Sequence, residues 1–482
     1  MPVKCGYPLR HDSRGPEPRA RYITRKNADE ETIMAGKHRN GVSRREFMTA
    51  AAAAGTIAIV PSHVLGAKNG AAPPSETVNV AQIGCGGKGA GDCRLAERAG
   101  GKIVALCDVD SKRAGRTFKA YGKRAKVFKD FRKLLDKMGR DIDAVVVSTP
   151  DHMHARISLQ AIRMGKGVYC QKPLTRTVEE SRTIAQAVAK HKVATQMGIQ
   201  GNASGSNQSI TELLRAGAIG TVREVHIWTD RPVKWWPQGM GMPSGSPKIP
   251  ATLDWDLWLG VAPRRPYHPS YLPFVWRGWV GFGTGALGDI GCHALDSPFY
   301  CLGLDAPTSV KAQCSKFNKI SFPKWSIVEY KFPAVGKRPA IKLFWYDGGK
   351  RPQRPKELEK DRGWGNNGKL YIGDKGKMLN GQIIPETKRR AFGKPPETLP
   401  RPAGHYSDWI NACKGATKDG KPIVPGANFS YSGPLAEAVL LGNVALYYPG
   451  EELKWDPKKM TFTNKPQADA LLSGEYREGW KL

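Results

Sequence analysis

The chain has 482 residues, of which 40% are hydrophobic and 24% are charged, so it is long enough for two or three domains and is not disordered throughout. Its formal net charge of +32 would suit a nucleic-acid-binding protein, but the basic residues are spread along the chain and no helix-turn-helix, zinc-finger or RNP motif is present. We therefore expect a basic exported enzyme with no nucleic-acid partner.

Residues 1–75 differ from the rest of the chain and are typical of a basic leader with an export signal. The segment 43–48 reads SRREFM, a twin-arginine signature, and an alanine-rich stretch from Met48 to Val60 follows it. This apolar stretch is too short to span a bilayer, which needs about 20 residues. We expect a removable twin-arginine signal that exports the folded protein to the periplasm, with no membrane insertion after its removal. The alternative is a disordered basic leader with a chance arginine pair, and translation starting at Met34 is also open.

A strand, a glycine-rich turn, a helix and a second strand are predicted between Val78 and Asp108. The turn has the G-x-G-x-x-G spacing of a dinucleotide site, and its glycines are Gly84, Gly86, Gly87 and Gly89. Such glycines permit a tight bend, let the backbone approach a pyrophosphate and let the helix pack against the strand. Asp108 follows about 20 residues later, where a carboxylate accepts hydrogen bonds from a ribose 2′-hydroxyl. We predict NAD here and consider NADP less suited, although Lys112 and Arg113 could turn toward a 2′-phosphate.

Apolar runs alternate with helical patterns up to Met197, and then the alternation stops. Strands are predicted at 78–83, 103–107, 126–128, 144–148, 167–170 and 193–197, with helices between them such as 111–121 and 178–191. Such alternation predicts a Rossmann NAD-binding domain at 76–198, with a mostly parallel sheet covered on both faces. The later strands, predicted at 309–314, 325–332, 340–345 and 369–373, have no helices between them. They predict a second, α+β domain at 199–482 on a mainly antiparallel sheet, with a helix near 434–448 packing back.

The nine cysteines show no C-x-x-C pair and no spacing typical of metal ligands. Three of them, Cys85, Cys107 and Cys170, lie within or just after apolar strands, where buried free thiols are common. We therefore expect no metal site and no disulfide framework.

Thr149 and Pro150 follow the strand at 144–148, and ligands of parallel sheets bind beyond such strand ends. We expect both residues to contact the cofactor. His154 lies early in the next helix, and we expect its ring to contact the nicotinamide end of the cofactor. For the other residues of segment 151–154, the alternative is a simple capping turn at Asp151.

Lys172 follows the strand at 167–170, and Pro173 after it bars a helical conformation at the lysine. A lysine held over this crevice can hydrogen-bond a substrate hydroxyl, although a solvated surface lysine is the ordinary case. Asp289 and His293 lie four residues apart, on one face if the segment is helical. A carboxylate and an imidazole so placed can orient a carbinol and take its proton. The alternatives are that Asp289 and His293 bind a metal ion or that they only pack in the structure.

These motifs, in this order, resemble the glucose-fructose oxidoreductase / inositol dehydrogenase (Gfo/Idh/MocA) family, from about Val78 to at least Asp296. The resemblance implies NAD, pyranose or cyclitol substrates, and a second domain whose large open sheet often mediates oligomerisation, so we expect a homodimer or homotetramer. The catalytic residues that it implies are Lys172, which also lies beside the cofactor, Asp289 and His293. One residue departs from the family pattern: Gln171 stands where a glutamate is usual, which removes a possible partner of the lysine.

The segment from Pro232 to Pro273 is rich in proline, glycine and tryptophan, which is typical of an ordered loop or lid. Flat aromatic faces suit the C–H faces of pyranoses, so we expect at least two tryptophans of this region to line a sugar pocket. The candidates are Trp228, Trp235, Trp236, Trp255, Trp258, Trp276 and Trp279, some of which would belong to the core.

The sequence thus favours an exported NAD-dependent oxidoreductase that acts on a CH–OH group of a sugar, glycoside or cyclitol, with NAD held tightly. His293 would accept the hydroxyl proton, Lys172 would polarise the oxygen, and Asp289 would orient His293 or the substrate. One alternative is a glycoside-cleaving lyase or hydrolase that oxidises its substrate transiently and then returns the hydride. Another is a non-catalytic carbohydrate-binding relative.

Overall fold

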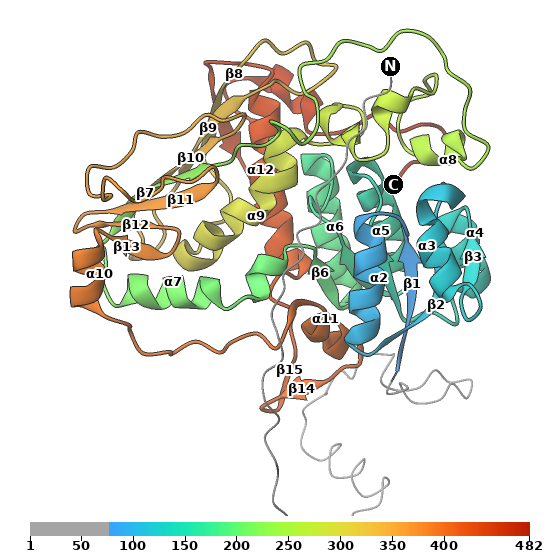
Figure 1. The fold of residues 1–482 in the computed structure, drawn as a ribbon, viewed down its shortest axis with the longest axis horizontal. Coiled ribbons are helices and arrows are strands. Elements are labelled where there is room, and N and C mark those ends of the chain that lie inside the picture. Colours follow the sequence, from blue (N-terminus) through green and yellow to red (C-terminus); the bar gives the residue numbers. More distant parts are fainter. Residues whose placement is uncertain (1–76) are drawn as a thin grey trace, which may run out of the picture. The chain divides into compact units, whose positions relative to one another are not determined.

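The structure is a computed structural model that describes residues 77–482. The predicted leader and twin-arginine signal lie outside the described residues. Two large sheets organise the described part of the chain (Figure 1). One is parallel and the other is mainly antiparallel, so the predicted fold class is confirmed.

The parallel sheet forms the Rossmann domain. Its strands are β1 (Val78–Ile83), β2 (Gly101–Cys107), β3 (Lys126–Phe128), β4 (Ala144–Val147), β5 (Gly167–Cys170) and β6 (Thr195–Met197), in the order β3-β2-β1-β4-β5-β6. The helices are α2 (Lys88–Arg98), α3 (Ser111–Tyr121), α4 (Phe131–Met138), α5 (His154–Arg163) and α6 (Val178–His191). Every residue of β4 and β5 is buried, because central parallel strands have helices on both faces.

Successive residues of β1 face different helical layers. Val80 belongs to a buried cluster with residues of α2, α3 and α11 (His405–Cys413). Ala81 and Ile83 belong to the cluster that contains residues of α4, α5 and α6. A helix from the C-terminal part of the chain, which the sequence analysis did not predict, therefore completes one face of the Rossmann sheet.

The second sheet has nine strands. They are β7 (Val222–Trp228), β8 (Ser309–Cys314), β9 (Ser326–Phe332), β10 (Ile341–Tyr346), β11 (Gly368–Gly373), β12 (Lys377–Leu379), β13 (Gln382–Ile384), β16 (Glu452–Asp456) and β17 (Thr461–Phe462). Their order is β13-β12-β11-β7-β10-β9-β8-β16-β17, and β7 and β10 are its parallel pair. Along β9 every second side chain is buried and the others are half-buried, which is the alternation of a sheet with one well-covered face.

Helices α9 (Gly285–Leu302) and α12 (Phe429–Ala445) lie between the two sheets (Figure 1). Helix α12 packs against α6 of the Rossmann domain and against α9, and it corresponds to the helix predicted near 434–448. The remaining elements are α7 (Ser206–Arg215), α8 (Trp255–Leu259), α10 (Glu386–Phe392), the hairpin of β14 (Thr417–Lys418) and β15 (Lys421–Pro422), and five 3-10 turns: η1 (Asp151–Met153), η2 (Gln200–Ala203), η3 (Pro269–Tyr271), η4 (Val275–Gly278) and η5 (Pro466–Leu471).

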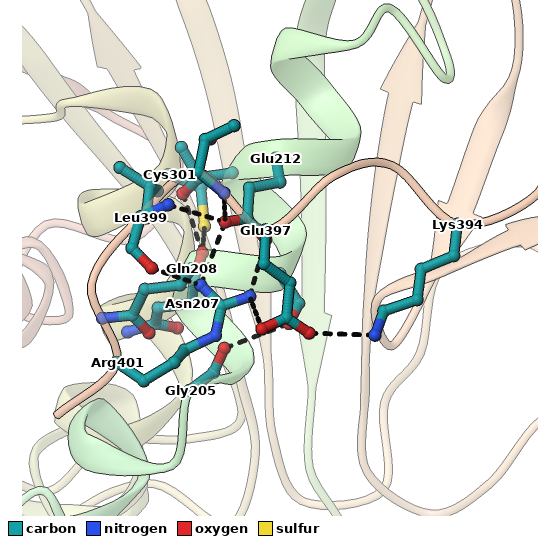
Figure 2. Close-up of polar contacts among 12 residues, drawn as sticks. Gly205, Asn207, Gln208, Glu212, Cys301, Lys394, Glu397, Leu399 and Arg401 are labelled. Atoms are coloured by element: carbon teal, nitrogen blue, oxygen red, sulfur yellow. Dashed lines mark hydrogen bonds and ion pairs between the residues drawn. The ribbon is translucent and has the colours of Figure 1, made fainter. Parts of the chain in front are cut away.

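Residues 393–404 carry the chain from α10 to α11 and are fixed to α7 by Glu212 (Figure 2). The Glu212 carboxylate accepts hydrogen bonds from the backbone N–H groups of Thr398 (2.7 Å) and Leu399 (2.9 Å) and pairs with Arg401 (2.7 Å). Hydrogen bonding from Arg401 lowers the pKa of Glu212 to about 2. This carboxylate therefore anchors the segment that leads to α11.

The eight cysteines of residues 77–482 are free thiols, and Cys85, Cys107 and Cys170 are buried. Within the same range, no three histidine, cysteine or acidic side chains are grouped so as to hold a metal ion. None of the helices in this part of the chain is both long and apolar enough to cross a bilayer.

Candidate active site

A cavity of about 450 Å³ is lined by residues that follow β1, β2, β4 and β5, by the loop before α9 and by α9 itself. In parallel sheets, this edge is where ligands bind. The predicted site residues that line it are Gly84, Gly86, Gly87, Asp108, Thr149, Pro150, Lys172 and His293. Three other predicted residues, Gly89, His154 and Asp289, are not part of the lining.

The glycine turn has the shape that a dinucleotide needs. Gly84 has a φ of +84°, and a β-carbon there would lie 2.5 Å from the carbonyl oxygen of Ser148. A β-carbon at Gly89 would collide with the carbonyl oxygen of Gly84, so α2 packs this closely only with glycine. Helix α2 has no side-chain cap at Gly87, so no side chain blocks its N-terminus from a pyrophosphate; within its first turn the N–H group of Gly89 donates to the carbonyl oxygen of Gly86 (3.0 Å). These residues therefore fit a dinucleotide.

Asp108 supports the glycine turn and also faces the cavity. Its carboxylate accepts hydrogen bonds from the N–H groups of Cys85 (2.7 Å), Gly86 (3.2 Å) and Asp110 (2.9 Å). Burial raises its pKa, and these N–H groups oppose that rise by favouring the charged form. A carboxylate has about four acceptor positions, so one remains for a ribose hydroxyl.

Lys172 and Arg277 share one carboxylate, that of Asp289 in α9. The Lys172 ammonium donates to Asp289 Oδ1 (2.6 Å) and to its carbonyl oxygen (2.9 Å), and the Arg277 Nε donates to Oδ1 (2.8 Å). Burial disfavours the charged form of Asp289, but the positive charges of Lys172 and Arg277 outweigh it and lower the pKa well below its usual range. Asp289 thus stays ionised and holds the two cations at the cavity.

His293 lies one helical turn after Asp289 and lines the cavity. Burial, together with the charge of Lys172, lowers its pKa to about 3, so the imidazole is neutral at physiological pH. A neutral imidazole can accept a proton. No hydrogen bond joins Asp289 to His293 in the described part of the chain, so Asp289 positions Lys172 more directly than it positions the imidazole.

Asp151 is a second buried carboxyl at the cavity, and it does not act as a helix cap. Its Oδ2 accepts a hydrogen bond from Thr284 Oγ1 (2.7 Å), at the start of α9, and its Oδ1 has no partner among residues 77–482. Burial raises its pKa to about 7, although the Thr284 hydrogen bond and the charge of Arg277 act in the opposite direction. The side chain therefore ties η1 to α9 and titrates near neutral pH.

The structure does not bring His154 to the cavity. Its Nδ1 lies 2.7 Å from the carbonyl oxygen of Pro173, and its Nε2 lies 2.9 Å from that of Thr149. Both ring nitrogens thus bind the backbone around the two strand ends, in contrast to the expected contact with nicotinamide. The nearby His152 lies between the carbonyl oxygens of Trp258 (3.0 Å from Nε2) and Phe282 (3.3 Å from Nδ1), and because burial lowers its pKa to about 3, the neutral ring donates to one of them.

Gln171, which replaces the family's usual glutamate, is bound to a buried carboxylate on α2. Its Nε2 donates to Asp92 Oδ2 (2.8 Å), and Asp92 is 0% exposed. Asp92 also accepts hydrogen bonds from Ser148 Oγ (2.7 Å) and Tyr406 Oη (2.6 Å) and pairs with Lys88. Asp92 therefore joins the glycine turn, two strand ends and α11.

The predicted lid contacts both domains. Two tryptophans of the aromatic-rich region, Trp258 and Trp276, line the cavity, as predicted. The carbonyl oxygen of Thr252 accepts a hydrogen bond from the N–H group of Ser111 (3.0 Å), so the loop reaches the turn that follows Asp108. The other candidates are Trp228, Trp236, Trp255 and Trp279, which are buried, and Trp235, which is half exposed.

The sequence analysis missed two residues of this site, Arg277 and Asp92. Arg277 stands between Trp276 and Trp279, shortly before the Asp289 motif, and an arginine among aromatic residues was an available signal. Asp92 lies three residues after Gly89, on the first turns of the helix, but nothing nearby in the sequence indicates its burial.

Two models of one oxidoreductase family match nearly the whole described chain. Residues 78–199 match the NAD-binding Rossmann fold, and residues 204–482 match the C-terminal alpha/beta domain of this Gfo/Idh/MocA family. The inositol 2-dehydrogenase 3 of Saccharopolyspora erythraea is 35% identical over 154 residues, 31% of this chain and 44% of that protein. The levoglucosan dehydrogenase of Pseudarthrobacter phenanthrenivorans is 28% identical over 174 residues, 36% of each chain. The chain thus spans less than half the length of these relatives.

Solved structures have the same fold. The WlbA dehydrogenase from Bordetella pertussis, in complex with NADH and UDP-GlcNAcA, has a TM-score of 0.54 at 16% identity, over 79% of this chain and 99% of that one. A levoglucosan dehydrogenase in complex with NADH and levoglucosan has a TM-score of 0.51 at 16% identity, over the same shares. With both domains matched in order and the glycine turn intact, the chain belongs to the Gfo/Idh/MocA oxidoreductase family and carries its NAD-binding Rossmann domain.

Proposed function

We propose that the protein is an NAD-dependent dehydrogenase that oxidises a CH–OH group of a sugar or cyclitol. The observation that carries this proposal is that an ammonium, that of Lys172, and the neutral imidazole of His293 line the same cavity as the glycine turn. An ammonium polarises a hydroxyl oxygen, and a neutral imidazole accepts its proton. The relatives named as inositol and levoglucosan dehydrogenases support a sugar-like substrate.

Each residue has its own part in the proposed reaction. Lys172 donates a hydrogen bond to the substrate oxygen, and His293 accepts the hydroxyl proton. Asp289 keeps the ammonium in place and offsets its buried charge. NAD, held by the glycine turn and Asp108, supplies a hydride acceptor when it is bound. The alcohol carbon then loses a hydride, the oxygen loses a proton, and the product is a carbonyl compound.

The test is NADH formation across a panel of pyranoses, glycosides and cyclitols. Lys172→Ala and His293→Ala should each lower kcat at least about 100-fold, because each removes a group that acts on the hydroxyl proton or oxygen. Both variants should still bind NAD, since neither residue belongs to the glycine turn. Lys190→Ala, at an exposed position on α6, is the matched control and should keep its rate. Near-normal turnover in either variant would remove that residue from the mechanism, and binding without any turnover would favour a carbohydrate-binding protein.

We propose further that the enzyme is exported with NAD already bound. The twin-arginine signature and the lid contact between Thr252 and Ser111, beside the ribose site, support this proposal. A cofactor that stays bound must be reoxidised in place. Either it reduces a second substrate, or it returns the hydride to the same sugar after an elimination step. The measurement is the activity of exhaustively dialysed enzyme without added nucleotide. If dialysis abolishes the activity, and if it returns only with millimolar NAD and yields stoichiometric free NADH, the proposal of a bound, exported NAD is contradicted.

A homodimer or homotetramer is also part of the proposal. The support is the nine-stranded sheet, whose second face is only half-buried along β9 in the single chain. Light scattering of the purified protein measures its mass, and a monomer at micromolar concentration would contradict this assembly.

A further inference from the structure

The cavity carries an excess of positive charge where the catalytic side chains meet it. Lys172 and Arg277 are both cations, and Asp289 is the one carboxylate that they share. His293 is uncharged because burial and the charge of Lys172 lower its pKa to about 3. Asp151 is mostly protonated below pH 7, since burial raises its pKa to about 7. Below pH 7 one positive charge is therefore left over, at neutral pH the ionised fraction of Asp151 offsets part of it, and oxidised nicotinamide adds another when it is bound.

Arg277 is held in a way that leaves one arm of its guanidinium free. Its Nε donates to Asp289 and its Nη1 donates to the carbonyl oxygen of Phe274 (3.1 Å), whereas Nη2 has no hydrogen-bond partner among the described residues. The guanidinium lies 4.2 Å from the ring centroid of Trp276 and 4.4 Å from that of Phe274. The side chain is 17% exposed and lines the cavity. Because the group is already fixed, binding an anion costs little further side-chain entropy.

We propose that the substrate carries a carboxylate group, as a uronic acid does, and that Arg277 binds this group through Nη2. The inference rests on the proposed dehydrogenase function and names its substrate class. An unbalanced buried charge is costly, and a bound anion that accepts hydrogen bonds from it removes that cost.

A carboxylate suits the site better than the other anion that sugars commonly carry. A carboxylate brings one negative charge, which equals the excess charge around Lys172 and Arg277. A phosphate ester brings several acceptor oxygens and about −1.5 to −2 at pH 7, whereas Arg277 has a single arm, Nη2, without a partner among the described residues, so most of the phosphate oxygens would gain no hydrogen bond from it. The guanidinium covers one face of the Trp276 ring, and the ring also lines the cavity, so its remaining apolar surface can contact the C–H groups of the same sugar.

The test compares substrates that differ only at C6. Methyl glycosides of glucuronate, galacturonate and mannuronate are assayed beside the methyl glycosides of the matching neutral hexoses and of the hexose 6-phosphates. We expect at least one uronate to exceed its neutral counterpart in kcat/KM by about tenfold or more, which is the effect of one hydrogen bond to a charged group. Tryptophan fluorescence of the NADH-loaded enzyme measures uronate binding independently of turnover.

The variants Arg277→Gln and Arg277→Lys separate recognition from support of Asp289. Arg277→Gln should lower turnover of the uronate and of its neutral counterpart alike, because the contact with Asp289 is lost. The informative quantity is therefore the ratio of kcat/KM for the uronate to kcat/KM for the neutral glycoside, which should fall to near one. Arg277→Lys keeps the charge without the planar fork and should keep part of the preference. Arg264→Gln, at a side chain that is 79% exposed, is the matched control and should leave the ratio unchanged.

The outcomes distinguish this inference from the proposed function. Equal kcat/KM for uronates and neutral glycosides, or a uronate preference that survives Arg277→Gln, overturns the inference and leaves the dehydrogenase intact. A preference for 6-phosphates overturns it as well. Uronate binding that depends on Arg277 but yields no NADH with any substrate supports the inference and contradicts the dehydrogenase.

Discussion

Replacing Gln171 with glutamate would place a second carboxylate against the buried Asp92. The amide nitrogen of Gln171 lies 2.8 Å from Asp92 Oδ2, and Asp92 is 0% exposed. A carboxylate oxygen in the place of this nitrogen turns a donor into a like charge. We therefore expect Gln171→Glu to destabilise the protein in a way that depends strongly on pH.

The distance sets the size of the effect. Two unit charges 2.8 Å apart repel by about 6 kcal/mol at an effective dielectric constant of about 20. The pair can avoid this repulsion by binding a proton, which for a glutamate of ordinary pKa costs about 5 kcal/mol at pH 8 and about 1 kcal/mol at pH 5. At both pH values, protonation of the glutamate costs less than the repulsion of about 6 kcal/mol, so the glutamate should bind a proton. The free energy of unfolding should therefore fall by about 5 kcal/mol at pH 8 and by about 1 kcal/mol at pH 5. Lys88, which pairs with Asp92, makes both losses of unfolding free energy somewhat smaller.

The measurement is chemical denaturation of Gln171→Glu, Gln171→Met and the wild type at pH 5 and pH 8. The Gln171→Met control also loses the donor but adds no charge, so its loss should be nearly equal at the two pH values. The double variant Asp92→Asn with Gln171→Glu exchanges donor and acceptor and should recover much of the stability at pH 8. A Gln171→Glu loss that is equal at both pH values would refute the reasoning.

Three other variants test single carboxylates. Asp108→Ala should weaken NAD binding at least about tenfold and relax discrimination against NADP, as measured by titration, and purified protein that contains NADP would contradict the assignment. For Asp151→Asn, the melting temperature should become less sensitive to pH between about 4 and 7: in the wild type, burial raises the folded pKa to about 7, so the contribution of this group to stability is full below the unfolded pKa of 3.8 and falls as pH rises. Glu212→Gln should lower the melting temperature at pH 7 and reduce the acid sensitivity between about 4.5 and 2, since hydrogen bonds from Arg401 lower the folded pKa to about 2 and the stability that Glu212 contributes is lost as pH falls.

The sequence predicted the elements whose signals are local. The strands expected at 78–83, 126–128, 167–170 and 309–314 have those bounds in the structure, because short apolar or alternating runs mark strands directly. The strand-end position of Lys172 predicted that it faces the ligand edge of the parallel sheet, and the structure places it at the cavity; His293 lines the same cavity from α9, and only the resemblance to the family had linked it to Lys172.

Contacts between distant segments could not be predicted in the same way. Tyr406 donates to Asp92 across 314 positions, and neither residue has a neighbour in sequence that reveals the pair. Helix α11, which carries Tyr406, is short, and its burial comes from the Rossmann sheet that it covers. For His154 the sequence located the helix start, but the direction of the ring follows from two carbonyl oxygens, those of Thr149 and Pro173. Side-chain direction depends on the assembled fold.

Asp289 links Lys172 to the loop that carries Arg277. Its carboxylate binds Lys172 at the end of β5 and Arg277 in η4, while its own backbone belongs to α9. One carboxylate cannot neutralise two cations, so the site reaches charge balance when a second anion is present. On the proposed binding mode, the substrate carboxylate supplies that anion at Arg277, and the energy of binding it is transmitted to Lys172 through their shared partner. Recognition of the carboxylate and placement of the catalytic ammonium would then be linked, because both cations donate to the same Oδ1 atom.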